Sequence, residues 1–418
     1  MTDGPPVQGL RVLDLADESG ALCGRILADL GADVVKVEPP GGDAGRRVPP
    51  FAHDQPDLES SLSWLAANAG KRGITCNLAS PTGRDLFRRL VERADVVVST
   101  ARWLGPGLQY DDLIGINAGL IFAALRPYGA HGPLDTRPAS DLEVTAASGA
   151  LWLAGDPDGV PVRTSLPMSL AWTGMYAACG VLLAVLARDQ IGRGQFVDVS
   201  AQASMLTAIS HAPVFWDLLG EEQSRSGPFL VGRSVTGAQF RNIWPCRDGY
   251  ITFALYGGAA GRATARALVA WMEERGGGQE PGLSLLKQID WDEFDVATAS
   301  PELVARIEDA IEPFFLQLTK EEFFRGVGER NMLGYPVATV TDIDRDEQLA
   351  ARDFWQTVPS PWGEGPVRFP GGFALFDGQR LAVTRGAPRV GEHNLEVYRD
   401  ELGLSPDDVT ALRSAGVL

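Results

Sequence analysis

The chain has 418 residues, a length that indicates about two domains. Of these residues 45% are hydrophobic and 22% are charged, a composition typical of folded proteins. Its formal net charge of −17 argues against nucleic acids and anionic membranes as partners, because both are bound by clustered Lys and Arg side chains. The cysteines have no paired spacing, so the sequence indicates no disulfide framework and no metal site: Cys23, Cys76, Cys179 and Cys246.

The N-terminal residues do not have the pattern of a secretory signal, because neither a basic segment nor a following apolar segment is present. The longest apolar stretch, residues 175–187, is too short to cross a bilayer and is expected to form a buried helix. We therefore expect a soluble protein with a cytoplasmic location.

The first part of the chain alternates between strand and helix patterns. Residues 9–15 are expected to form a short buried strand, residues 21–31 a helix, and residues 32–37 a second strand. Short connections of this kind indicate a parallel sheet with right-handed crossovers. The alternation continues through a helix that begins at Ser80-Pro81, and it predicts a Rossmann-like α/β domain. Because no Gly-x-Gly-x-x-Gly follows the first strand, dinucleotide binding is not indicated.

The later part of the chain predicts a smaller α+β domain. A strand pair is expected around the turn at residues 247–249, and residues 261–275 and 301–326 have helical patterns. Residues 366–388 are rich in Gly and Pro, which indicates a linker. The predicted divisions are a large domain at 1–215 plus 376–418, a small domain at 228–345, and linkers at 216–227 and 346–375.

A small acidic turn, Gly155-Asp-Pro-Asp-Gly-Val-Pro161, stands in an otherwise apolar and neutral stretch. Gly and Pro supply the backbone angles of a tight, exposed turn, which can present a carboxylate. Asp and Glu carboxylates act as nucleophiles on activated acyl groups in several enzyme classes. Taken alone, the turn favours the ordinary interpretation of a solvated surface loop.

Five segments, in a fixed order along nearly the whole chain, relate it to a known family: Gly24-Arg-Ile-Leu-Ala-Asp-Leu-Gly-Ala-Asp-Val-Val-Lys-Val-Glu-Pro-Pro-Gly-Gly-Asp43, Asn68-Ala-Gly-Lys-Arg72, Tyr128-Gly-Ala-His-Gly-Pro133, Gly192-Arg-Gly-Gln-Phe-Val-Asp-Val-Ser200 and Gly391-Glu-His393. On these segments the chain resembles the class III coenzyme A transferases, a group that includes formyl-CoA:oxalate CoA-transferase and, more remotely, α-methylacyl-CoA racemase. The resemblance implies a Rossmann-like large domain and a small α+β domain in each subunit of an interlocked dimer. Racemisation needs a His-Asp pair, and it is disfavoured because the matching positions are Ser140 and Leu170.

The resemblance also implies a catalytic aspartate in the acidic turn. Asp158 is the match, and Asp156 is the fallback. Ser19 stands where the transferases often have a glutamine that helps to bind the reacting groups, although it could instead cap the following helix. Of the family's glycine-rich segment, which covers the intermediate, only Gly237 and Gln239 remain.

Coenzyme A is implied as a substrate, in the form of an acyl-CoA, and not as a permanently bound cofactor. Lys71, Arg72 and Arg126 match basic positions of the family that would hold CoA. Arg102 alone remains of a further family segment, Glu-Asn-Phe-Arg-Pro-Gly, which follows the fourth predicted strand, and Lys36 is a weaker candidate. For each side chain, a solvated charge is the alternative interpretation.

The implied reaction moves CoA from an acyl-CoA donor to a small carboxylic acid through an aspartyl anhydride and an aspartyl-CoA thioester. The changed loop after the first strand and the changed glycine-rich segment predict a substrate larger than formate and oxalate. A homodimer is expected, and a heteromer with a homologous subunit stays open. The alternatives are a non-catalytic subunit of a hetero-oligomeric CoA-transferase and, less favoured, a CoA-ester lyase or dehydratase.

Overall fold

The computed structural model describes residues 4–230, 239–255, 258–276, 282–296, 298–360, 362, 365–383 and 385–418. The chain divides into two compact units. The first unit comprises residues 1–150, 164–210 and 347–418, and the second unit comprises residues 151–163 and 211–346. The acidic turn thus belongs to the second unit, whereas the sequence analysis assigned it to the large domain.

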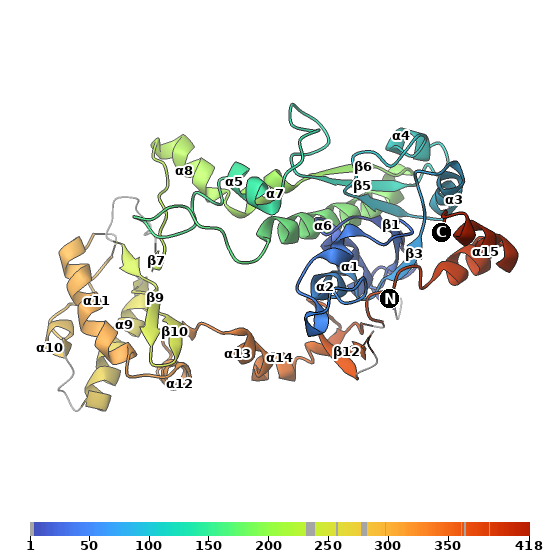
Figure 1. Ribbon diagram of the computed structural model, residues 1–418. Helices are drawn as coiled ribbons and strands as arrows, with labels where there is room; N and C mark the ends of the chain where they lie inside the picture. Colours follow the sequence, from blue (N-terminus) through green and yellow to red (C-terminus); the bar gives the residue numbers. More distant parts are fainter. Residues whose placement is uncertain are drawn as a thin grey trace. The chain divides into compact units, whose positions relative to one another are not determined.

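A parallel sheet of six strands, in the order β3-β2-β1-β4-β5-β6, forms the centre of the first unit (Figure 1). The strands are β1 (Arg11–Leu15), β2 (Asp33–Glu38), β3 (Arg72–Thr75), β4 (Val96–Ser99), β5 (Ile121–Arg126) and β6 (Phe196–Ser200). Several of them are continuous apolar runs, such as Val96-Val97-Val98, which is typical of parallel strands that are covered on both faces. The predicted α/β class with a parallel sheet is confirmed.

Helices cover both faces of this sheet (Figure 1). The helices and helical turns are α1 (Ala21–Asp29), η1 (Ala44–Arg47), η2 (Ala52–Asp54), α2 (Leu62–Asn68), α3 (Pro81–Val91), α4 (Tyr110–Leu113), α5 (Asp141–Ala147), α6 (Met168–Ile191) and α7 (Ala201–Ala208). Neighbouring residues of a strand point to opposite faces. Val12 of β1 therefore packs with α1 and α6, whereas Leu13 packs with α3 and α4.

The helix α6 is longer than the predicted residues 175–187. By length and composition alone it could cross a membrane, but one side packs against the sheet, where Ala177 and Val181 are fully buried. On the opposite side, Leu183 and Leu186 are 66% and 65% exposed. The expected buried helix is therefore buried on one side only, because the other side of α6 does not belong to the core.

The C-terminal part of the first unit contains a hairpin in the region that the sequence analysis took for a linker. Its strands are β12 (Trp355–Pro359) and β13 (Pro366–Pro370), and Val358 and Phe369 are buried against Leu65 of α2. The prolines at the ends of the strands concealed the pattern, because Pro normally indicates a loop or a strand edge. The other elements here are α14 (Glu347–Ala351), β14 (Leu375–Phe376), β15 (Gln379–Arg380), η3 (Leu395–Glu401) and α15 (Pro406–Ser414).

The second unit contains a three-stranded antiparallel sheet in the order β11-β10-β9. The strands β9 (Ile243–Cys246) and β10 (Gly249–Thr252) form the predicted hairpin, and β11 (Tyr335–Pro336) pairs with β10. Fully buried aromatic side chains, including Trp244 and Phe315, form its core. Other elements of this unit are α8 (His211–Leu219), β7 (Phe229–Leu230), β8 (Phe240–Arg241), the long helix α9 (Gly258–Gly276), α10 (Leu283–Leu286) and α13 (Val340–Asp344).

The helix predicted at residues 301–326 is divided in two. α11 (Pro301–Phe315) ends before Thr319, and α12 (Lys320–Glu329) begins after it. Thr319 Oγ1 accepts a hydrogen bond from Glu322 N–H at 3.1 Å, and the Glu322 side chain accepts one from Thr319 N–H at 2.8 Å. This capping box starts a new helix where the apolar periodicity alone indicated one continuous helix.

Candidate active site

The strand order creates a crevice at the carboxyl ends of β1 and β4. In the sheet, β2 and β3 lie on one side of β1, and β5 and β6 lie on the opposite side of β4. The loops that follow β1 and β4 therefore run in opposite directions. Ligands of open α/β sheets bind at such a point. A cavity of about 650 Å³ lies here, and its lining includes Asp17, Glu18 and Ser19 after β1 and Thr100 and Arg102 after β4.

The loop after β5 provides another wall of this cavity. Arg126 ends β5, and Arg137 lies in the following loop. The structure thus brings three predicted site residues, Ser19, Arg102 and Arg126, to one cavity. Sequence reasoning missed Arg137, which only its place in a loop after a strand's carboxyl end could have indicated.

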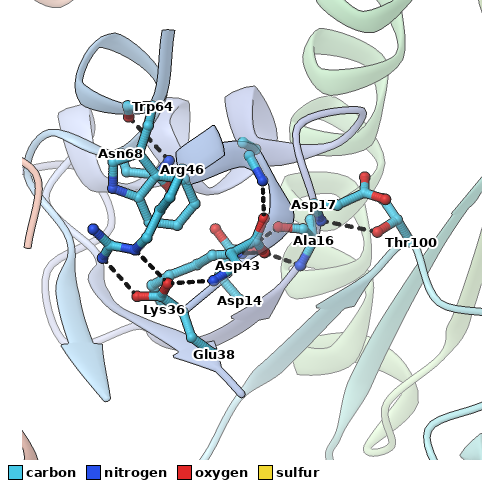
Figure 2. Close-up of polar contacts among 12 residues, drawn as sticks. Asp14, Ala16, Asp17, Lys36, Glu38, Asp43, Arg46, Trp64, Asn68 and Thr100 are labelled. Atoms are coloured by element: carbon cyan, nitrogen blue, oxygen red, sulfur yellow. Dashed lines mark hydrogen bonds and ion pairs between the residues drawn. The ribbon is translucent and has the colours of Figure 1, made fainter. Parts of the chain in front are cut away.

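Three hydrogen bonds order the loop after β1. Asp17 N–H donates to Thr100 Oγ1 at 2.9 Å, which joins this loop to the loop after β4 (Figure 2). The Ser19 N–H and hydroxyl both donate to Asp17 Oδ1. Gly20 is the N-cap residue of α1, so the alternative role of Ser19 as a helix cap is wrong. The Ser19 oxygen keeps lone pairs that can accept a hydrogen bond from a ligand.

Arg126 presents a fixed positive charge to the cavity. Its guanidinium donates to Ser99 O at 2.8 Å, Leu125 O at 2.9 Å and Ala101 O at 2.6 Å. These acceptors carry no charge, so they hold the side chain in place without neutralising it. Burial, partly countered by the nearby carboxylate of Asp198, lowers the pKa of Arg126, but an arginine stays protonated at neutral pH.

Arg102 and Arg137 add two exposed guanidinium groups to the same cavity. Arg102 forms a 3.4 Å ion pair with Asp135, which also lines the cavity. Because such an exposed ion pair contributes little, an anionic ligand can replace Asp135 as its partner. Three guanidinium groups in one cavity suit phosphates or carboxylates, which accept paired hydrogen bonds from arginine.

The cavity is also lined by acidic groups, which limit where an anion can bind. Glu18 lines the cavity beside other carboxylates. Burial raises the pKa of Glu18, and the carboxylates of Asp17 and Asp43 raise it further. An anionic ligand is therefore expected to bind on the side of Arg126 and Arg102, away from Glu18.

Lys71 does not reach this cavity, which corrects the prediction that it contacts CoA. Its side chain is fully buried, and its Nζ donates to Asp14 Oδ2, Ala21 O and Asn68 Oδ1, each at 2.8 Å. These bonds use all three ammonium protons, so none is left for a phosphate. Burial lowers the pKa of Lys71, although Asp14 partly opposes this effect.

The predicted CoA contact of Arg72 is corrected for a similar reason. Its guanidinium forms ion pairs with Asp33, Glu396 and Glu401, and only 8% of the side chain is exposed. Burial would lower its pKa, but the hydrogen bonds to Asp33 and Glu401 raise it overall. A phosphate would meet three carboxylates here, so Arg72 serves to attach the C-terminal segment to β2 and β3.

Lys36, the weaker candidate, is also fully buried. It affects the cavity only through its hydrogen bond to the backbone of Ala16 (Figure 2). Its Nζ donates to Ala16 O and, at 3.1 Å, to Asp43 Oδ2. Ala16 N–H in turn donates to Asp14 Oδ1 at 2.9 Å. Ala16 directly precedes the loop that lines the cavity, so these buried charges position that loop without touching a ligand.

Asp158 lies in the second unit, on an exposed turn. Gly159 N–H donates to Asp156 O at 3.1 Å, which closes a four-residue turn with Pro157 and Asp158 at its centre. Gly155 has a φ of 117°, an angle that glycine adopts without strain. Among the described residues, none forms a hydrogen bond or an ion pair with the Asp158 carboxylate. Within the described part of the chain, this carboxylate has no partner to give up before it could attack an acyl group.

Two residues, Gly237 and Gln239, remain of the family's glycine-rich segment. Gly237 lies outside the described residues. Gln239 is exposed and immediately precedes β8 in the second unit. The roles of both residues in the reaction stay predictions.

The positions that a racemase would use carry no acid/base pair. Ser140 and Leu170 both line the cavity, and neither side chain transfers protons at neutral pH. Ser140 is the N-cap residue of α5. Asp141 accepts hydrogen bonds from Ser169 N–H at 3.0 Å and Ser169 Oγ at 2.7 Å, so it holds the start of α6 and has a structural role.

Comparisons with known proteins agree with this arrangement. The sequence pattern of CoA-transferase family III matches residues 7–394. The chain is 35% identical to subunit BbsE of succinyl-CoA:(R)-benzylsuccinate CoA-transferase from Thauera aromatica, over 94% of each chain. It is 29% identical to formyl-CoA:oxalate CoA-transferase from Streptomyces coelicolor, over 99% of each chain. A CAIB/BAIF family protein from Brucella suis has a similar structure, with a TM-score of 0.77 and 27% identity over 95% of this chain and 99% of that one.

The chain belongs to CoA-transferase family III, and it is an enzyme of this class. The family that the five sequence segments indicated is confirmed. CoA thioesters are the substrates of this class, which agrees with a cavity lined by several arginine side chains.

The buried position of Lys71 predicts a loss of stability without a direct loss of CoA binding. Lys71→Met would leave Asp14 buried and unpaired, which is expected to lower the free energy of unfolding by about 3–5 kcal/mol. Urea denaturation measures this change, and Asp14→Asn combined with Lys71→Met should recover part of it.

Lys287→Met is the matched control, because it removes an exposed lysine that is paired with Glu273. It should leave the urea midpoint nearly unchanged. If Lys71→Met kept wild-type stability and lost acyl-CoA affinity, Lys71 would be a CoA contact after all.

Proposed function

We propose that the protein transfers coenzyme A from an acyl-CoA to a dicarboxylic acid, with Asp158 as the nucleophile. The Asp158 carboxylate attacks the thioester carbonyl, the C–S bond breaks, and CoA leaves as the thiolate. The thiolate then attacks the Asp158 carbonyl of the anhydride, which releases the donor acid and forms an aspartyl-CoA thioester. The acceptor carboxylate attacks this thioester, and the same steps in reverse yield the new acyl-CoA and free Asp158.

The observation that carries this proposal is the exposed carboxylate of Asp158, which has no partner among the described residues and stands on a hydrogen-bonded turn. A carboxylate engaged in an ion pair would have to break it before attacking a thioester. Asp156 is exposed too, but its Oδ1 lies only 2.8 Å from the position that a Cβ on Gly227 would occupy. The Asp156 carboxylate thus packs against the chain at Gly227, which favours Asp158 over the fallback.

Arg102 and Arg126 are proposed to bind CoA. Arg126 offers a charge that its carbonyl partners leave unneutralised, and Arg102 has only a long, exposed ion pair to give up. Both can pair with phosphate oxygens. Ser19 is proposed to bind the reacting groups from the loop after β1.

The acceptor is proposed to be a dicarboxylic acid larger than oxalate. Benzylsuccinate and oxalate, which appear in the names of two relatives, are both dicarboxylic acids. Arg137 provides a further exposed cation that could pair with a second carboxylate. Ser19, in place of a longer glutamine, leaves more space beside the loop after β1.

The active enzyme is proposed to be a homodimer in the cytoplasm. A specific observation supports a hetero-oligomer as the second candidate, because the relative from Thauera aromatica is named as a subunit. Exposed apolar side chains such as Leu183, Leu186 and Trp216 are compatible with either assembly. Size measurement of the chain expressed alone, and beside any homologous partner, separates the two candidates.

Replacement of the nucleophile is expected to abolish transfer. Asp158→Asn should lower kcat on the order of 10⁴-fold or more, because an amide does not form the anhydride. Wild-type protein incubated with an acyl-CoA and quenched with hydroxylamine should carry a hydroxamate on the peptide containing Asp158, detectable by mass spectrometry.

Asp156→Asn is the matched control in the same turn, and it should retain the hydroxamate. A hydroxamate that persists in Asp158→Asn and disappears in Asp156→Asn would transfer the assignment to Asp156.

The acceptor preference is expected to depend on the second carboxylate. Succinate should be a better acceptor than butyrate, which has the same carbon skeleton length, by about tenfold or more in kcat/KM, the size of one charge-assisted hydrogen bond. Oxalate is expected to be a poor acceptor. Equal rates with succinate and butyrate would contradict the dicarboxylate preference, and efficient transfer to oxalate would contradict the larger acceptor.

Removal of the fixed cation is expected to weaken acyl-CoA binding. Arg126→Gln should raise the Kd about tenfold or more, because it deletes a charge at the cavity. Calorimetry with acyl-CoA measures the change. Arg188→Gln is the control, since Arg188 pairs with Asp95 just before the start of β4, at the other end of the strand from the cavity. An equal effect of both substitutions would contradict a direct role of Arg126.

A further inference from the structure

The side chain of Arg225 holds the turn that carries Asp158. Its guanidinium donates to three backbone carbonyls within the second unit: Gly159 O at 2.9 Å, Asp156 O at 3.3 Å and Trp152 O at 3.3 Å. A guanidinium has five N–H donors in a planar fork, so it can bind several carbonyls at once. Arg225 thereby contacts the residues on both sides of Asp158 but not its carboxylate.

The ring of Trp152 keeps this guanidinium in place. The central carbon of the Arg225 guanidinium lies 4.7 Å from the centre of the Trp152 ring, a distance typical of a cation–π contact. The indole N–H of Trp152 donates to Gln223 O at 3.1 Å, two residues before Arg225. The segment at Trp152 and the segment at residues 223–225 are thus joined by contacts that each of them donates to the other.

The contacts of Arg225 coincide with the ends of the turn. Asp156 and Gly159 are its first and last residues, and they are already joined by the hydrogen bond from Gly159 N–H to Asp156 O. Pro157 restricts the backbone at the second position. With both ends held, the backbone of Asp158 has little freedom, although its side chain makes no bond to a described residue.

We propose that Arg225 is a positioning residue for the acylation of Asp158. The proposal rests on the assignment of Asp158 as the nucleophile. In that step an Asp158 oxygen bonds to the thioester carbonyl carbon and the C–S electron pair leaves with CoA. Arg225 touches none of these atoms. It restricts the turn before the substrate arrives, so less orientational freedom is lost when the carboxylate attacks.

The test compares acylation rates in single turnovers. Arg225→Ala should slow the formation of the Asp158 hydroxamate, after a hydroxylamine quench, by about 100-fold at saturating acyl-CoA, with little change in the acyl-CoA concentration for half-saturation. Arg225→Lys should fall between, because an ammonium lacks the planar fork. Guanidinium ion added to Arg225→Ala should restore part of the rate, because it can bind the same three carbonyls in place of the lost side chain.

Arg163→Ala is the matched control, because Arg163 is an exposed arginine in the same segment of the second unit. It should acylate at the wild-type rate. Amide exchange of the peptide around residues 152–162 measures the turn without any reaction, and exchange should be faster in Arg225→Ala than in Arg163→Ala.

The outcomes separate the two claims. If wild-type protein acylates and Arg225→Ala acylates equally fast, the positioning role is overturned. The positioning role is also overturned if guanidinium ion does not restore the acylation rate of Arg225→Ala and this variant has a lower melting temperature that accounts for its slow acylation. If wild-type protein forms no hydroxamate with any acyl-CoA while amide exchange still responds to Arg225→Ala, the assignment of Asp158 fails, and the clamp is structural only.

Discussion

The geometry of the first unit depends on one buried carboxylate, that of Asp14 in the central strand β1. One of its oxygens accepts a hydrogen bond from Lys71 Nζ and the other accepts one from Ala16 N–H. A Cβ on Gly24 would lie 2.2 Å from Asp14 Oδ2, so α1 can pass beside this carboxylate only because residue 24 is glycine. Sequence segments that look like separate motifs, around Gly24, Lys36 and Lys71, are therefore parts of a single buried cluster.

This cluster fixes a conformation more than it adds stability. Two charges removed from water lose hydration that their attraction only partly restores, so a buried ion pair is weak evidence for stability. The two buried lysines of the cluster are affected in opposite directions. Burial lowers the pKa of Lys71, whereas the carboxylates of Asp14 and Asp43 outweigh burial and raise the pKa of Lys36. The consequence is local: Ala16 is held by Lys36 and Asp14, and the loop that lines the cavity begins at the next residue.

The sequence predicted what depends on local patterns and missed what depends on distant partners. The spacing of apolar residues in strands and helices depends only on neighbouring residues. The position of Arg126 at the end of a strand can be predicted from the same local pattern. The role of Lys71 depends on Asp14, which lies 57 residues away, and that of Arg72 depends on Glu401, which lies 329 residues away. A basic residue in a motif therefore looks the same whether it binds a phosphate or a buried carboxylate, and only the fold distinguishes the two.

The two chemical tasks of the proposed reaction have their supports in different units of the chain. The arginine side chains of the cavity belong to the first unit, where Arg126 is held by the carbonyls of Ser99, at the end of β4, and Ala101, in the loop after it. The turn of Asp158 is held within the second unit by Arg225 and Trp152. Each support is formed within its own unit, so a substitution in one unit leaves the hydrogen bonds of the other support in place. Binding of CoA and orientation of the nucleophile can accordingly change independently through substitutions in one unit or the other.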